Sequence, residues 1–259
     1  MGQQATIESL FGWPVKGFSG MELSKMPLRA HKPYVHDRLW AIERAGPLFD
    51  AGNPRHIPKG KFFQLVNTPA LAKLKSTYDA ATTRFALFDA DGNELAAGEL
   101  NTPQGRAAIE NFLAGWLGDL APHPPRVVGI GDHHFFDVPK PWVSLISLDT
   151  LRDMAPHAGQ PLHEQKQRFR ANIYVRGMPA WAELDWEGRE ILLNGQPAFV
   201  ARERIGRCVA TEVNPETGER DCVIPRMMLT TYGHKDCGLY LEPLADITLR
   251  PGDVLSLAA

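Results

Sequence analysis

Apolar and polar residues alternate over positions 5–11, the period of a half-buried β-strand. Similar short runs bounded by turn residues predict further strands at residues 38–42, 84–88, 94–100, near 127, and at 144–146, 172–175, 190–193, 198–201, 208–213, 239–242 and 254–257. Asp91-Gly92 and Asn194-Gly195 separate adjacent runs, and both pairs favour tight hairpin turns. The pattern therefore predicts a mainly β protein.

A few helices interrupt these strands. Thr102-Pro103 provides an N-cap followed by proline at the first helical position, and an amphipathic run follows at 107–113. Thr68-Pro69 is a second N-cap and proline pair, and it predicts a helix at residues 70–74. Shorter helices are predicted at 147–154 and 225–232. A proline-rich stretch at 122–125 is the best linker, which divides the chain into domains 1–120 and 121–259. Closely spaced strands in the second domain predict a barrel or a sandwich.

Composition narrows the class of protein. The 259 residues are 44% hydrophobic with a net charge of −2, so the chain can bury a core and is not intrinsically disordered. Three cysteines exclude a disulfide scaffold and favour a cytoplasmic protein. The near-neutral charge argues against nucleic acid as a partner, and no apolar run is long enough to span a membrane. Residues 1–6 fit the short myristoylation pattern at Gly2.

Cys208 is the first candidate for chemistry, because Arg207 precedes it and further arginines lie upstream. A thiolate is a soft metal ligand, and nearby guanidinium groups favour the charged form. An isolated cysteine at the start of a strand is also a common buried packing residue, and the residues alone leave both interpretations open. Lys16-Gly17 and Lys59 lie in predicted turns, where they either bind an anion or are simply solvated.

Other metal and hydrolase signals are weak. His133 and His134 are neighbours in the chain, so on a strand they point to opposite faces and do not chelate one ion easily. Cys222, His234 and Cys237 contain no C-x-x-C pair, which argues against a structural zinc site. The sequence also has no G-x-S-x-G elbow, P-loop or H-E-x-x-H motif.

Several segments together resemble one family. Residues 207–218 (RCVATEVNPETG) resemble the cysteine motif of MOSC domains, the C-terminal domain of molybdenum cofactor sulfurases. Residues 168–175 (RFRANIYV) and 250–254 (RPGDV) resemble two further blocks of that domain. Residues 13–20 (WPVKGFSG) and 37–40 (DRLW) resemble the β-barrel domain that often precedes it. These segments span nearly the whole chain in the family order.

The resemblance implies a fold and a site. The fold is a MOSC β-barrel related to the pyruvate kinase barrel domain, preceded by a smaller β-barrel-like domain. The cofactor is the molybdenum cofactor, a molybdopterin, with Cys208 as the catalytic residue and molybdenum ligand. The other expected cofactor-binding residues are Lys16, Gly17, Lys59, Arg170, Asn172, Arg207 and Thr211.

The sequence also resembles the mitochondrial amidoxime reducing component and its bacterial relatives within this family. This resemblance implies an oxidoreductase that reduces small N-hydroxylated substrates, although Ala171 stands where those reductases usually have proline. No ferredoxin-type C-x₄-C-x₂-C spacing is present, so a separate flavin or iron–sulfur protein is the expected electron donor. Pyridoxal phosphate is associated with the family but is not expected to bind, since no lysine has the usual Schiff-base context.

Two alternatives remain beside the reductase. The protein is a non-catalytic carrier if it only delivers the cofactor, or if Cys208 carries sulfur as a persulfide. A degenerate barrel that acts as an interaction module would bind no cofactor. In that case, replacing Cys208 and Lys16 would change nothing.

Overall fold

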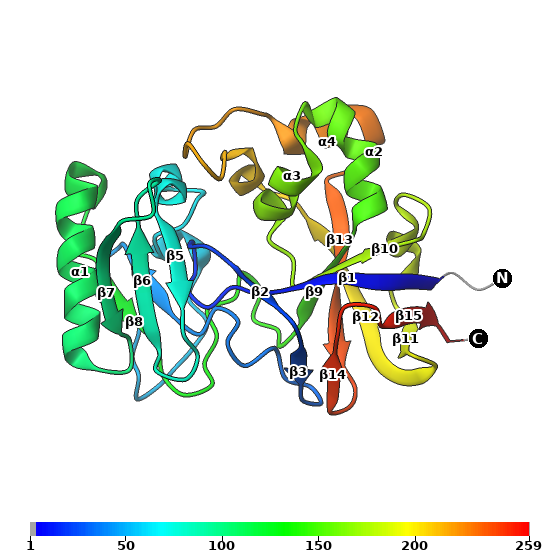
Figure 1. Ribbon diagram of the computed structural model, residues 1–259, viewed down its shortest axis with the longest axis horizontal. Helices are drawn as coiled ribbons and strands as arrows, with labels where there is room; N and C mark the ends of the chain where they lie inside the picture. Colours follow the sequence, from blue (N-terminus) through cyan, green and yellow to red (C-terminus); the bar gives the residue numbers. More distant parts are fainter. Residues whose placement is uncertain (1–3, 259) are drawn as a thin grey trace.

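The computed structural model describes residues 4–258 and forms two lobes that lie side by side (Figure 1). Gly2, the residue of the myristoylation pattern, lies outside the described residues. None of the helices within residues 4–258 has the length and apolar character needed to cross a membrane. The structure is mainly β with four α-helices, which confirms the predicted fold class.

The larger lobe is a closed barrel of seven strands. Their order around the barrel is β1 (Gln4–Gly12), β10 (Ile173–Arg176), β9 (Val143–Ser147), β13 (Asp236–Pro243), β12 (Gln196–Gly206), β11 (Glu190–Leu193) and β15 (Val254–Leu257), which pairs with β1 again. All neighbours are antiparallel except β9 and β10. Leu10, Leu145 and Phe199 are fully buried in its core, because alternate side chains of each strand point inward.

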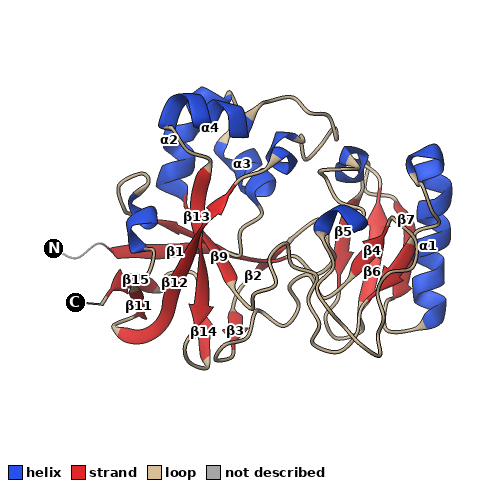
Figure 2. Cartoon of the chain, turned by 180° about the vertical axis from the view of Figure 1, so that it is seen from behind, coloured by secondary structure: helices blue, strands red, loops and turns tan. Residues whose placement is uncertain are grey.

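Short elements extend this barrel. Strand β2 (Met21–Leu23) pairs with β1, while β3 (Met26–Leu28) pairs with β14 (Ile247–Leu249). Helices α2 (Leu148–Ala158), α3 (Leu162–Phe169) and α4 (Ile224–Tyr232) gather over one end of the barrel (Figure 2). A short 3₁₀ helix, η4 (Ala182–Trp186), precedes β11. Helix α3 was not predicted, because only eight residues separate Pro161 from the left-handed Arg170.

The smaller lobe is a three-stranded antiparallel sheet covered by one helix. The strands are β5 (Lys75–Tyr78), β6 (Arg84–Phe88) and β7 (Glu94–Glu99), and the helix is α1 (Pro103–Leu117). The predicted cap is confirmed, since Thr102 Oγ1 accepts the Gly105 N–H at 3.0 Å. Helix and strand approach closely because both contact positions are glycine: a Cβ on Gly98 would lie 2.2 Å from the Gly105 carbonyl oxygen.

Further short elements complete the smaller lobe. Strands β4 (Ala41–Glu43) and β8 (Arg126–Val128) pair beside the small sheet, and the 3₁₀ helices η1 (Lys59–Lys61), η2 (Pro69–Lys73) and η3 (Gly118–Leu120) lie in its connections. The chain leaves β1 through Trp13 and enters the small lobe at Val15, which bridges to Trp40. The division at residue 120 stays a prediction, although β1 to β3 contribute to the barrel of the C-terminal half.

One predicted strand is wrong. Residues 208–213 form a 3₁₀ turn, η5 (Val209–Glu212), instead of a strand. Thr211 is the cause, because its N–H and its hydroxyl both donate to the Cys208 carbonyl oxygen, at 3.1 and 2.9 Å. Such local bonds from a threonine side chain compete with sheet pairing.

Candidate functional site

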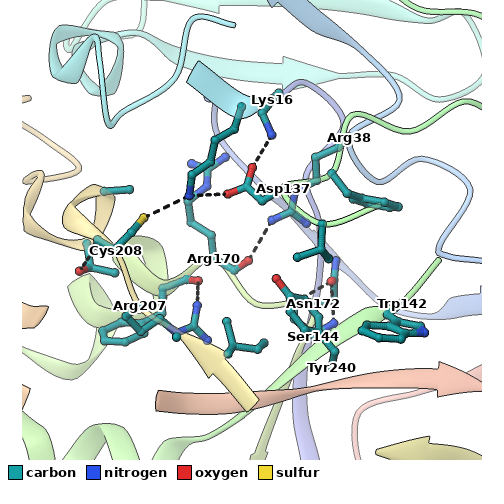
Figure 3. Close-up of a pocket in the computed structure, with 18 of the residues that line it drawn as sticks. Lys16, Arg38, Asp137, Trp142, Ser144, Arg170, Asn172, Arg207, Cys208 and Tyr240 are labelled. Atoms are coloured by element: carbon teal, nitrogen blue, oxygen red, sulfur yellow. Dashed lines mark hydrogen bonds and ion pairs between the residues drawn. The ribbon is translucent and has the colours of Figure 1, made fainter. Parts of the chain in front are cut away.

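A cavity of about 360 Å³ opens where the two lobes meet. Its walls come from the turn after β1, from η1, from the C-terminal end of α3 and from the loop after β12 (Figure 3). All the residues predicted for the site line this one cavity: Lys16, Gly17, Lys59, Arg170, Asn172, Arg207, Cys208 and Thr211. Segments that are far apart in the sequence therefore meet at one place, while the role of each residue stays a prediction.

The cavity is strongly cationic. Three acidic residues line it, namely Asp37, Asp137 and Glu203. Eight basic residues line it as well, namely Lys16, Arg38, Lys59, Lys140, Arg168, Arg170, Arg204 and Arg207. Charges of one sign in a cleft concentrate ligands of the opposite sign. The cavity therefore fits an anionic ligand such as a phosphorylated one.

Cys208 lies at the N-terminal cap of η5, directly after Arg207. Its side chain is half-buried and faces the cavity beside Lys59, whose Nζ donates to Sγ at 3.7 Å. A thiol placed between water and a cation is a suitable soft ligand. The packing interpretation fits Cys237 better, because burial raises the pKa of this fully buried thiol to about 12.

Asp137 links the two cavity lysines, and sequence reasoning missed it. Its carboxylate binds Lys16 Nζ at 2.5 Å and Lys59 Nζ at 3.3 Å. The surrounding protein favours the neutral acid, but the two ammonium groups outweigh this effect and lower the pKa of Asp137. Burial lowers the pKa of Lys16 despite this partner. No sequence signal identified Asp137, because Lys16 lies 121 residues earlier and Lys59 lies 78 residues earlier.

The pKa of Lys59 changes in the opposite direction from that of Lys16. Burial alone would lower the pKa of its ammonium group, but Asp137 and Cys208 raise it overall. Lys59 is therefore a protonated donor that faces both an oxygen anion and a sulfur atom. Gln64 fixes the backbone of this turn by donating to the Lys59 carbonyl oxygen at 2.7 Å.

Arg170 caps α3 in the left-handed conformation, with φ of 54°. Its guanidinium carbon lies 4.2 Å from the centre of the Trp13 ring, and Nη2 donates to the Phe18 carbonyl oxygen. Arg38 Nη2 donates to the Arg170 carbonyl oxygen at 3.2 Å. Burial and the nearby Arg38 charge lower the pKa of Arg170 to about 9. An anion would therefore relieve repulsion between two guanidinium groups.

Asn172 and Arg207 line the cavity but bond mainly to the protein. Asn172 Oδ1 accepts from the N–H and the hydroxyl of Ser144, at 3.0 and 2.8 Å. Arg207 donates to the carbonyl oxygens of Cys237 and Phe169. These residues, like Thr211, fix the cavity wall around Cys208 and have few polar atoms left for a ligand.

Gly17 allows the Lys16 turn to approach the small lobe. Its φ is +89°, a conformation that residues with a Cβ rarely adopt. A Cβ there would also lie 2.8 Å from the Phe63 carbonyl oxygen. The side chain of Lys16 is 6% exposed and donates to the Phe135 carbonyl oxygen at 2.8 Å, so this turn fixes the lysine in the wall.

The histidine pair does not form a metal site with its neighbours. Across residues 4–258, no three His, Cys, Asp or Glu side chains are grouped to hold a metal ion. His134 instead bonds through Nδ1 to the Asp37 carbonyl oxygen at 2.6 Å, and its ring stacks on Phe136.

Two family models match the chain, one in each half. Residues 4–114 match the family model described as the MOSC N-terminal beta barrel domain, and residues 131–256 match that of the MOSC domain. Among solved structures, the YUAD protein from Bacillus subtilis is similar over 99% of this chain and 97% of its own, with 14% identity and a TM-score of 0.47. No curated protein matches the chain significantly.

Proposed function

The chain belongs to the MOSC family, whose domains are associated with the molybdenum cofactor, and we propose that its cavity binds this cofactor with Cys208 as the metal ligand. The observation that carries the proposal is the position of Cys208. It is a half-buried thiol in a cavity that is lined by eight basic residues and only three acidic ones.

The residues of the cavity fit the chemistry of the cofactor. A pterin cofactor with a phosphate group needs cations, and Lys16, Lys59 and Arg38 provide them within one wall. Soft thiolate sulfur suits a metal that cycles between oxidation states, and Cys208 provides the thiolate. Asn172 and Thr211 hold the cavity wall around Cys208 in place, because both side chains are almost fully buried and hydrogen-bonded within the protein.

We infer that the site serves as a reductase of N-hydroxylated compounds. A bound molybdenum centre supplies two electrons, which with two protons convert an N-hydroxyl group to N–H and release water. Lys59 holds its proton at Nζ next to Cys208 Sγ and balances the thiolate charge. Asp137 orients that ammonium group through one carboxylate oxygen and pairs with Lys16 through the other. Electrons come from a separate flavin or iron–sulfur protein in this proposal.

Metal analysis tests the ligand assignment. We would produce the protein and Cys208→Ala in a host that makes the cofactor, with Cys222→Ala as the matched control. The expected result is molybdenum in the wild type and in Cys222→Ala, and its loss from Cys208→Ala. Equal molybdenum in all three proteins would rule out Cys208 as the ligand.

Turnover separates the reductase from a carrier. A reductase is expected to reduce benzamidoxime with an artificial electron donor, whereas a carrier binds the cofactor without turnover. If the isolated protein instead carries a persulfide at Cys208, mass spectrometry would show one additional sulfur atom there. We favour the reductase because Lys59 places a proton donor beside the sulfur atom, which cofactor storage does not require.

A further inference from the structure

A second cavity of about 660 Å³ adjoins the first. Its walls come from residues 27–35, which begin within β3, from the loop at 54–56 and from the segment 132–141. Phe136, Val138 and Lys140 line both cavities, so this segment forms the boundary between them. We call the second space the histidine cavity, because four of the nine histidines line it, namely His31, His56, His133 and His134.

The lining of the histidine cavity combines apolar surface with positive charge. Of its seventeen residues, eight are apolar, and five of these are prolines. Four others are arginine or lysine, four are histidine, and the only acidic one is Asp132. The Asp132 carboxylate is mostly exposed and lies 3.7 Å from Lys32, which already balances it. Such a lining fits an apolar ligand that carries a negative charge.

Arg29 and Arg55 are the cations that lack a partner. Within residues 4–258, neither side chain makes a hydrogen bond or an ion pair, although both line the same cavity. A guanidinium group presents its N–H donors as a planar fork that matches a carboxylate. Both groups are therefore available to a carboxylate on the ligand.

One histidine ring of the cavity stacks on an aromatic neighbour and forms a flat surface with it. The described part of the chain holds no cluster of three or more His, Cys, Asp or Glu side chains that could by itself hold a metal ion. The His134 ring is nearly parallel to Phe136, with 5.1 Å between the centres and 4° between the planes. Phe136 belongs to both cavities, so a flat ligand packed there would extend toward the Cys208 cavity. Aromatic rings pack favourably on such surfaces.

We propose that the histidine cavity binds a small aromatic carboxylate, whose carboxylate pairs with Arg29 and Arg55 and whose ring packs along Phe136. We further propose that this ligand is the substrate, an N-hydroxylated aromatic acid that reaches the first cavity past the shared wall. This second step rests on the proposed reductase function, whereas the binding step does not.

Calorimetric titration of the full chain, purified without molybdenum, tests the binding step. We expect naphthoate to bind and the neutral naphthamide to bind about tenfold more weakly. Arg29→Gln and Arg55→Gln should each weaken naphthoate binding by about tenfold. The control is Arg226→Gln, an exposed arginine on α4 outside the cavity, which should bind like the wild type. Equal binding of both probes, no binding, or unchanged binding in the double variant would overturn the site.

Turnover by the molybdenum-loaded protein tests the substrate step. We expect a higher kcat/KM for para-carboxybenzamidoxime than for benzamidoxime, and we expect this preference to disappear in the Arg29→Gln/Arg55→Gln variant. Reduction of both compounds without preference would overturn the substrate assignment. If neither compound is reduced while naphthoate binding depends on both arginines, the reductase function fails and the binding site stands.

Discussion

The ammonium group of Lys59 donates to the Sγ atom of Cys208 across 3.7 Å, although 149 positions separate the two residues. The same Nζ lies 3.3 Å from Asp137, whose other oxygen binds Lys16. These contacts form one continuous series in the cavity wall. It runs from Lys16 through Asp137 and Lys59, and it ends at Cys208. The Cys208 thiol is therefore connected with Asp137 and Lys16 through Lys59.

Cys208 is expected to be the first of the three thiols to react with iodoacetamide. Burial raises the pKa of Cys222 to about 11 and that of Cys237 to about 12. Near pH 8, about one molecule in a thousand or fewer therefore carries a thiolate at either position. Peptide mass spectrometry after a short exposure would measure the order. Earlier labelling of Cys222 or Cys237 would contradict the assignment of Cys208 as the reactive thiol.

Lys59→Met is expected to slow the alkylation of Cys208 several-fold. The change removes the only cation bonded to Sγ among the described residues and keeps a side chain of similar length. The matched control is Lys61→Met in the same turn, since the Lys61 side chain has no bonded partner within residues 4–258. Rates at a fixed pH would be compared by mass spectrometry. Equal rates in the two variants would show that Lys59 does not act on the thiol.

Much of the fold was predictable because local signals agreed with the final packing. The Thr102 cap, the Asp91-Gly92 hairpin and the alternation in β1 depend on neighbouring residues only, and all three are present in the structure. The stretch after Cys208 was mispredicted because its apolar residues alternate as in a strand. There, the two local bonds from Thr211 decide the conformation.

The segments that meet at the candidate cavity were predictable, but the bonds among their residues were not. Family-like segments identified eight residues that line one cavity. The partners of Arg207 are carbonyl oxygens at Cys237 and Phe169, which no local pattern connects with it. Asp137 was missed for the same reason, because only the folded chain brings it to Lys16 and Lys59.

Gly17→Ala is expected to destabilise the protein by about 2 kcal/mol, since it places a Cβ at positive φ against the Phe63 carbonyl oxygen. Gly115→Ala in α1 is the control. No atom lies within 4 Å of a Cβ added there, so we expect a gain of about 0.5 to 1 kcal/mol from helix propensity. Urea unfolding would measure both. A loss below about 0.5 kcal/mol in Gly17→Ala would show that the turn adapts to a side chain.

Asp137→Asn is expected to reduce stability at neutral pH by roughly 1 kcal/mol, because the half-exposed carboxylate pairs with Lys16 and Lys59. The two ammonium groups outweigh the unfavourable effect of the surrounding protein on the charged carboxylate, and they lower the pKa of Asp137 in the folded state. Its stabilising effect is therefore complete above the ordinary carboxyl pKa and disappears as the pH falls. Urea titrations between about pH 3 and pH 7 should show a smaller loss of unfolding free energy on acidification in Asp137→Asn than in the wild type.

The control is Asp91→Asn, which changes a turn carboxylate that makes no bond within residues 4–258 and should keep the wild-type profile. Parallel profiles for Asp137→Asn and the wild type would contradict a role for this ion pair.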